Sequence, residues 1–256
     1  MELLVERSGG VAHFVLNRPD AYNAIDAALR DQLLAALDAA ESDGTTCVVL
    51  RGEGRGFCAG MDLRAGGANR GVDLAQAMAR SSSRLTERFL RSSVPIVSAV
   101  HGACAGLGLT LALAADHCVA AADARFVAAF VGRSLVPDGA ISLLLPRLVG
   151  VARARRMLLF GDQVSAADAH EWGMVGELAG GADLVERAQT RAEALGMLPA
   201  HVVRYTRSLL ARSFDIGLDT VLFEEQLAQG VVSTSDDYAE GAAAFFEKRP
   251  PRFTGH

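Results

Sequence analysis

Two glycine-rich segments, each directly after a short apolar stretch, constrain the fold of this chain more than any other feature. The first spans residues 51–63 and follows the apolar stretch at 47–50; the second spans residues 101–108 and follows the apolar stretch at 96–100. A short apolar run bounded by glycines is typical of a buried strand, so each segment is predicted to leave the end of a strand. Glycine in such a turn lets another chain segment or a ligand come close to the backbone.

The pattern around these segments indicates strands alternating with helices over residues 1–150, and helices almost to the end after Gly150. Such alternation predicts stacked β-α units followed by a helical subdomain, within one domain. A hairpin is predicted at 3–16, and Asp26 is a plausible N-cap for a helix over 26–40. The other predicted elements are strands at 118–121 and 126–130 and helices at 73–91, 109–115 and 141–148.

Composition and charge exclude several classes of protein. Half of the 256 residues are hydrophobic and 21% are charged, which argues against a disordered chain. The net charge of −5, without a long basic run, argues against a nucleic-acid partner. The apolar runs are far shorter than the roughly 20 residues of a membrane span, and no secretory signal is evident, so we expect a cytoplasmic protein without a membrane partner. The four cysteines are widely spread, without the spacing of a disulfide framework or a zinc site.

Backbone amides at the two glycine turns suggest a binding function. A helix N-terminus offers unpaired N–H groups with partial positive charge, and two such turns side by side would direct two donors at one oxygen, as an oxyanion hole does. Neither turn carries the Lys-Ser/Thr end of a phosphate-binding Walker loop, and neither completes the dinucleotide fingerprint GxGxxG. The alternative is that the glycines only permit tight turns.

Several segments in order along the chain resemble one family. The chain resembles the crotonase superfamily, the enoyl-CoA hydratase/isomerase group, nearly from end to end. The similar segments are residues 17–25, the first glycine loop at 57–63, the signature region at 96–116, the turn at 135–139 and the tail at 245–250.

The resemblance implies an α/β fold, a crotonase-like spiral of repeated β-β-α units over residues 1–195. It also implies a helical C-terminal extension over 196–256 that packs in an oligomer, a homotrimer or a dimer of trimers. The implied substrate is an acyl-CoA thioester, as in fatty acid metabolism. No metal or redox cofactor is implied, since coenzyme A would arrive as part of the substrate.

The same resemblance assigns residues to the site. The thioester oxygen would be held by the backbone N–H groups of Met61 and Leu107. The family usually has a small residue where Leu107 stands, so this side chain is expected to reshape the acyl pocket. Ala24, Ala59 and Gly60 match segments that line the path of the coenzyme A adenosine and pantetheine. The remaining residues expected at the substrate are Asp62, Gly106, Thr110 and Phe130.

The acid/base residues separate two chemistries. Hydratases of the family use two glutamates, and the matching positions here are Thr110 and Phe130, neither of which is an effective proton carrier near neutral pH. Asp138 is the remaining carboxylate. It resembles the single acid that moves a proton between C2 and C4 in the family's double-bond isomerases. Apolar neighbours would raise the pKa of Asp138 toward that of a useful base. The alternative is that Asp138 caps a helix or a turn.

These observations favour a Δ3-Δ2 enoyl-CoA isomerase. Two other classes stay open: a hydratase or acyl-CoA thioester hydrolase with an unrecognised water-activating group, and a non-catalytic acyl-CoA-binding homologue. Asp62 is expected to cap its local turn, and the arginines at 18, 55 and 64 either meet coenzyme A phosphates or are solvated surface charges. The glycine-rich stretch at 64–72 is expected to be mobile.

Overall fold

The computed structural model describes residues 1–64 and 70–255, and the stretch predicted to be mobile falls largely outside them. A larger sheet has the strand order β1-β2-β3-β4-β6-β9; β1 and β2 are antiparallel and the other neighbours are parallel. Its strands are β1 Leu3–Ser8, β2 Val11–Leu16, β3 Cys47–Gly52, β4 Ile96–Val100, β6 His117–Ala121 and β9 Glu177–Ala179.

The larger sheet is covered on both faces, because alternate residues of its strands point to opposite sides. Val48 and Leu50 of β3 belong to the main core, whereas Cys47 and Val49 belong to a second core beneath helix α7. The helices of the spiral are α1 Ala27–Ala40, α2 Gly71–Met78, α3 Arg84–Leu90, α4 Leu107–Ala114, α5 Ile141–Arg155, α6 Ala166–Glu171 and α7 Leu184–Gly196.

A smaller sheet gives the fold its spiral form. It contains β5 Ala103–Ala105, β7 Arg125–Val127 and β8 Val164–Ser165, in the order β5-β7-β8. Single bridges extend it through the first glycine loop, joining Cys58 to Cys104 and Ile25 to Met61. In the units β4-β5-α4 and β6-β7-α5, the chain contributes a strand to the larger sheet, a strand to the smaller one and then a helix, as the crotonase-like spiral predicts.

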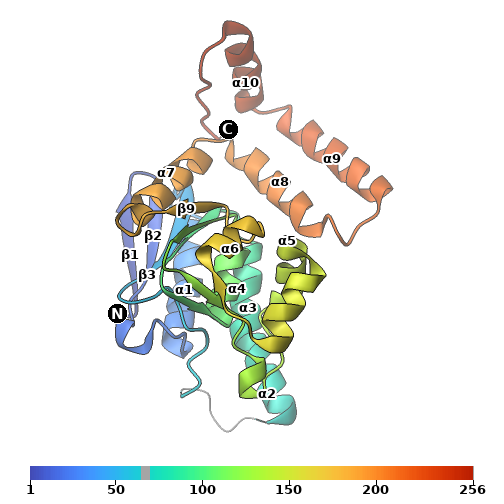
Figure 1. Ribbon diagram of the computed structural model, residues 1–256. Helices are drawn as coiled ribbons and strands as arrows, with labels where there is room; N and C mark the ends of the chain where they lie inside the picture. Colours follow the sequence, from blue (N-terminus) through green and yellow to red (C-terminus); the bar gives the residue numbers. More distant parts are fainter. Residues whose placement is uncertain (65–69, 256) are drawn as a thin grey trace.

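The last three helices stand away from the sheets (Figure 1). They are α8 Ala200–Arg212, α9 Leu218–Val232 and α10 Asp236–Glu247. Every residue of α8 and α9 is at least partly exposed, including large apolar side chains such as Leu218 and Phe223. So much exposed apolar surface is typical of an interaction surface.

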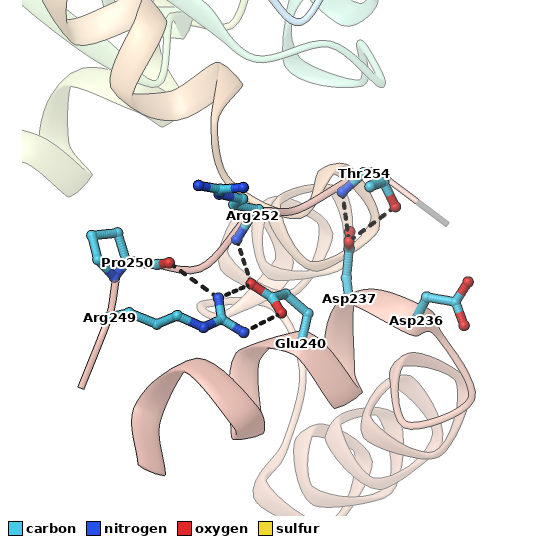
Figure 2. A pocket seen from close by; sticks show the side chains of 7 residues that line it. All are labelled: Asp236, Asp237, Glu240, Arg249, Pro250, Arg252 and Thr254. Atoms are coloured by element: carbon cyan, nitrogen blue, oxygen red, sulfur yellow. Dashed lines mark hydrogen bonds and ion pairs between the residues drawn. The ribbon is translucent and has the colours of Figure 1, made fainter. Parts of the chain in front are cut away.

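The tail folds back on α10 (Figure 2). Arg249 forms a two-pronged pair with Glu240, with N–O distances of 2.6 and 2.8 Å. The hydrogen bonds from Arg249 lower the pKa of Glu240 to about 2. Buried Asp237 accepts the N–H groups of Thr254 and Gly255 at 2.7 and 2.9 Å. Hydrogen bonds to Glu240 and Asp237 of α10 therefore hold the tail in place.

Most predicted elements are confirmed, with shifted ends. Asp26 caps α1 by accepting the Leu29 N–H at 2.9 Å, as predicted. Helix α4 begins two residues earlier than predicted, at Leu107, and the strand predicted over 126–130 is the shorter β7. The helix predicted over 73–91 is divided by a π turn at Ala79–Ser83.

We predict that Gly108→Ala destabilises the fold. A Cβ at Gly108 would lie 2.4 Å from the Cys58 carbonyl oxygen, a backbone atom that cannot move aside cheaply. The free energy of unfolding, measured by chemical denaturation, should fall by about 2 kcal/mol or more despite the better helix propensity of alanine. Gly230→Ala in α9, where a Cβ meets nothing within 4 Å, is the control and should be neutral or stabilising. Equal stability of the two variants would contradict this account.

Candidate active site

The two glycine-rich loops lie backbone against backbone. The Phe57 N–H donates to the His101 carbonyl at 2.9 Å, and Cys58 exchanges hydrogen bonds with its neighbours in β5, donating to Ala103 O at 3.1 Å and accepting from Ala105 N at 2.9 Å. The sequence analysis considered what two such turns would do if they lay side by side, and in the structure a short ladder of hydrogen bonds joins them.

The amides of Met61 and Leu107 emerge where this ladder ends. A Cβ on Gly60 would lie 3.2 Å from the Leu107 nitrogen, and the Met61 nitrogen is bonded directly to the Gly60 carbonyl carbon. Leu107 is the first residue of α4, so its N–H has no acceptor within the helix. Within residues 1–64 and 70–255, neither amide donates to a protein acceptor. Two neighbouring N–H groups are therefore left available.

Backbone conformations that favour glycine create this arrangement. Gly60 has a φ of 97° and Gly106 a φ of 52°, both in the region that side chains disfavour. The N–H of Gly106 is held by the Val127 carbonyl at 3.1 Å. The two glycines predicted at the substrate thus immediately precede the two amides that have no protein acceptor among the described residues.

The side chain of Asn23 holds the first glycine-rich loop by hydrogen bonds, a role that the sequence analysis did not identify. Its side-chain nitrogen donates to the carbonyls of Glu53, Gly56 and Phe57 at 2.9, 2.9 and 3.1 Å, and its side-chain oxygen accepts the Arg18 N–H at 2.8 Å. Asn23 is fully buried. A single amide side chain therefore satisfies three loop carbonyls.

Asp138 is half-buried in the turn before α5. Its Oδ2 accepts a hydrogen bond from Ser82 Oγ at 2.9 Å. Burial raises the pKa of Asp138 above its ordinary value, and the Ser82 hydrogen bond opposes that rise. The N-cap residue of α5 is Ala140, and its side chain makes no capping bond. The helix-capping alternative for Asp138 is therefore wrong.

The Asp138 turn lies against the start of α4. A Cβ on Gly139 would lie 3.0 Å from Leu107 Cδ1 and 3.6 Å from Thr110 Cγ2. The acid is therefore near the same helix end that presents the Leu107 amide. The Leu107 side chain packs against the turn that carries Asp138.

Thr110 and Phe130 are both buried, and neither supplies a carboxylate. Thr110 Oγ1 donates to the Gly106 carbonyl at 3.4 Å, one turn back in its own helix. Phe130 is 6% exposed and packs in the main core. The structure thus gives both side chains ordinary packing roles.

Ala24, Ala59 and Gly60, the residues predicted along the coenzyme A path, lie in or next to the first glycine-rich loop. Ala59 is exposed, and its N–H donates to the Tyr22 carbonyl at 2.9 Å. Asp62 accepts the Arg64 N–H at 3.0 Å, so the predicted local turn is confirmed. Asp62 also pairs with Arg18 at 3.1 Å.

Arg18 serves as an internal brace. Its guanidinium pairs with Glu2, Asp26 and Asp62 and donates to the Ala24 carbonyl at 2.5 Å. Arg18 is therefore not a solvated surface charge, and three carboxylates already compensate its charge.

The thiols near the site are inert. Burial raises the pKa of Cys58 to about 12, and it raises the pKa of Cys104 well above the ordinary value. A nucleophilic cysteine needs the opposite shift. His101 Nε2 lies 2.9 Å from the Gly54 carbonyl oxygen, which ties the second loop to the first.

Other possible sites do not coincide with this one. The hollow in Figure 2 lies on α10 and is lined by residues of the folded-back tail. In the part of the chain that the structure describes, histidine, cysteine and acidic side chains form no group of three that could hold a metal ion. Over residues 1–64 and 70–255, no helix combines the length and apolar character needed to cross a bilayer.

Comparisons with known proteins agree with the fold. The model of the enoyl-CoA hydratase/isomerase family matches residues 6–256. The 1,2-epoxyphenylacetyl-CoA isomerase of Escherichia coli K12 is 39% identical over 96% of this chain and 95% of its own length, and the 2,3-dehydroadipyl-CoA hydratase of the same organism is 31% identical over 99% of each. The crystal structure of enoyl-CoA hydratase EchA1 from Mycobacterium marinum is similar with a TM-score of 0.89, at 36% identity, over 100% of this chain and 99% of that one. The chain therefore belongs to the enoyl-CoA hydratase/isomerase family of the crotonase superfamily.

We predict that Asn23→Ala destabilises the protein by about 2–4 kcal/mol, because three carbonyls lose their donor and at least two of them are buried. The free energy of unfolding from urea denaturation measures this. Asn17→Ala is the control, since its side chain makes one exposed hydrogen bond, to the Met1 carbonyl at 3.2 Å. That variant should change stability by less than about 0.5 kcal/mol. Similar losses in both variants would argue against the bracing role.

Proposed function

We propose that the chain holds an acyl-CoA thioester by its carbonyl oxygen, using the N–H groups of Met61 and Leu107 as an oxyanion hole. The single observation that carries this proposal is the adjacency of these two unpaired amides at the end of the loop ladder. Two fixed donors stabilise the negative charge of an enolate more than that of the ground-state carbonyl, which lowers the barrier to its formation. Membership of an acyl-CoA enzyme family supports the substrate class.

Asp138 is the proposed acid/base of a Δ3-Δ2 enoyl-CoA isomerisation. Its carboxylate takes a proton from C2 of a 3-enoyl thioester, breaking a C–H bond and forming a dienolate held by the two amides. The same carboxyl then returns the proton to C4, leaving the double bond between C2 and C3. The step needs no water and no second acid, which suits a site whose one carboxylate lies in the turn packed against Leu107.

Hydration is the second candidate, because relatives with hydratase names share this fold. It requires groups that hold and deprotonate a water, and Thr110 and Phe130 supply neither. Thioester hydrolysis meets the same difficulty. A non-catalytic acyl-CoA-binding protein is the third candidate. Product mass separates them: isomerisation leaves the mass unchanged, hydration adds one water, hydrolysis releases free coenzyme A, and a binding protein turns over nothing.

The wider assignments follow from the same family. Ala24, Ala59 and Gly60 are proposed to line the path of coenzyme A, with Asp62 and Gly106 shaping the loops around it. The exposed apolar arm formed by α8, α9 and α10 is proposed to pack against other copies in a trimer or a dimer of trimers, leaving residues 1–195 as the catalytic spiral. Chemistry of this kind calls for no metal or redox cofactor.

We predict that Asp138→Asn lowers turnover of 3-enoyl-CoA substrates by at least about 100-fold, because an amide cannot carry the proton. Turnover is followed across a panel of acyl lengths by mass-resolved chromatography. Asp123→Asn, in an exposed turn, is the matched control and should keep wild-type rates. Unchanged turnover in Asp138→Asn would remove Asp138 from the mechanism.

The pH dependence of kcat/KM should report the same group. The base must be ionised in the free enzyme, and burial raises the pKa of Asp138. Activity should therefore be full above that raised pKa and should fall as the pH drops through it, at a higher pH than an exposed aspartate would produce. A flat profile down to the ordinary pKa of aspartate would contradict the assignment.

A further inference from the structure

The helix opposite Asp138 carries two hydroxyl groups on a face that is otherwise apolar. Ser82, Leu85, Thr86 and Phe89 are all buried, at the three- and four-residue spacing of one helical face. A buried hydroxyl in such a stripe costs free energy unless it is hydrogen-bonded. Ser82 has a partner, whereas Thr86 has none among the described residues, so Ser82 is the hydroxyl that suggests a role beyond packing.

Ser82 lies within the π turn that separates α2 from α3. This turn spans Ala79–Ser83 and changes the direction in which the following side chains point. Single π turns inside helices occur frequently at functional sites. Here the turn faces the loop before α5, since Ser82 reaches across 56 positions of sequence to Asp138.

The contact is one-sided. Ser82 is 1% exposed, whereas Asp138 is half-buried, so the hydroxyl lies behind the carboxylate as seen from solvent. Ser82 Oγ donates to Oδ2 of Asp138 at 2.9 Å. Among the described residues, Oδ1 receives no hydrogen bond from another side chain, although the backbone N–H of Asp138 itself also donates to the carboxylate. Oδ2 is thus the oxygen held by a neighbouring element, and Oδ1 is the oxygen without a side-chain donor.

We propose that Ser82 is the positioning residue of the acid/base group, holding Oδ2 of Asp138 so that Oδ1 carries the proton between C2 and C4; this rests on the proposed isomerisation. When Oδ1 takes the proton from C2, Oδ2 becomes the carbonyl oxygen and still accepts from Ser82. The carboxyl group therefore keeps its plane, and the O–H is directed at C4 without a rotation. The proton taken from C2 is the proton given to C4, so the step balances without a co-reactant.

The same hydrogen bond adjusts the strength of the base. It stabilises the ionised carboxylate and so opposes the rise in pKa that burial causes. An acid that must both accept and return a proton works best when neither form is strongly favoured. Burial and the Ser82 hydroxyl act in opposite directions on that balance.

The test compares Ser82→Ala, Ser82→Cys and Thr86→Val in the full chain, with kcat and KM measured over pH for 3-enoyl-CoA isomerisation. In Ser82→Ala, kcat should fall about tenfold while KM changes little, and the acid limb should move to higher pH, because the carboxylate loses a donor. Ser82→Cys keeps a side chain of similar shape but with a weaker hydrogen-bond donor. It should shift the acid limb of the pH profile in the same direction by a smaller amount. Thr86→Val removes the second hydroxyl of the face, which has no hydrogen-bond partner among the described residues, and should keep the wild-type profile.

Failure of this inference is distinct from failure of the proposed function. If Asp138→Asn is inactive but the Ser82→Ala and Ser82→Cys profiles superpose on the wild type, Ser82 does not position the acid and the isomerase proposal stands. If Thr86→Val shifts the profile as much as Ser82→Ala, general packing of the helix is responsible and the inference is overturned. If Asp138→Asn keeps its turnover, the proposed function itself fails. Ser82→Cys supplies the comparison should Ser82→Ala not fold.

Discussion

The close backbone contact between the two glycine-rich loops is the constraint on which the rest of the structure depends. Cys58 exchanges hydrogen bonds with β5, and the space for this exchange exists because positions such as Gly108 carry no side chain. The contact joins the smaller sheet to the first loop, and it sets the start of α4. The position of two peptide nitrogens therefore follows from sheet geometry and not from side-chain chemistry.

The local elements of the fold could be predicted from the sequence where a local cause dominates. The N-cap at Asp26 and the hairpin at the N-terminus each depend on residues close in sequence, and both are confirmed. The π turn at Ala79–Ser83 was not predicted, because its run of three serines suits a regular helix as well as an irregular one. In the structure, Ser81 Oγ donates to the Ala77 carbonyl at 2.7 Å, one turn back, and Ser82 Oγ donates to Asp138, 56 residues further along the chain.

In the candidate site, too, the features that depend on residues close in sequence could be predicted, and those that depend on distant residues could not. The glycine patterns indicated which amides emerge together, and the resemblance assigned Met61 and Leu107 to them. The sequence alone left Asp138 between a cap and an acid, because both roles suit an aspartate after a proline. The position of Ala140 at the helix start excludes the helix N-cap role, and the contact with Ser82 supports the proposed acid role. Asn23 was overlooked because its three partners lie in a loop about 30 residues away.

The number of acids beside an oxyanion hole decides which reaction its enolate can complete. Two carboxylates can share a water, whereas one carboxylate can only take a proton and give it back. In the proposed mechanism, Thr110 and Phe130 stand where a second acid would be needed, and both side chains are buried. The half-buried Asp138, whose Oδ2 accepts a hydrogen bond from Ser82, is then the proposed proton carrier, and its two oxygens are unequal. An unequal carboxylate favours transfer between two carbons on one face of the dienolate, because the oxygen that accepts the proton is also the one that can deliver it.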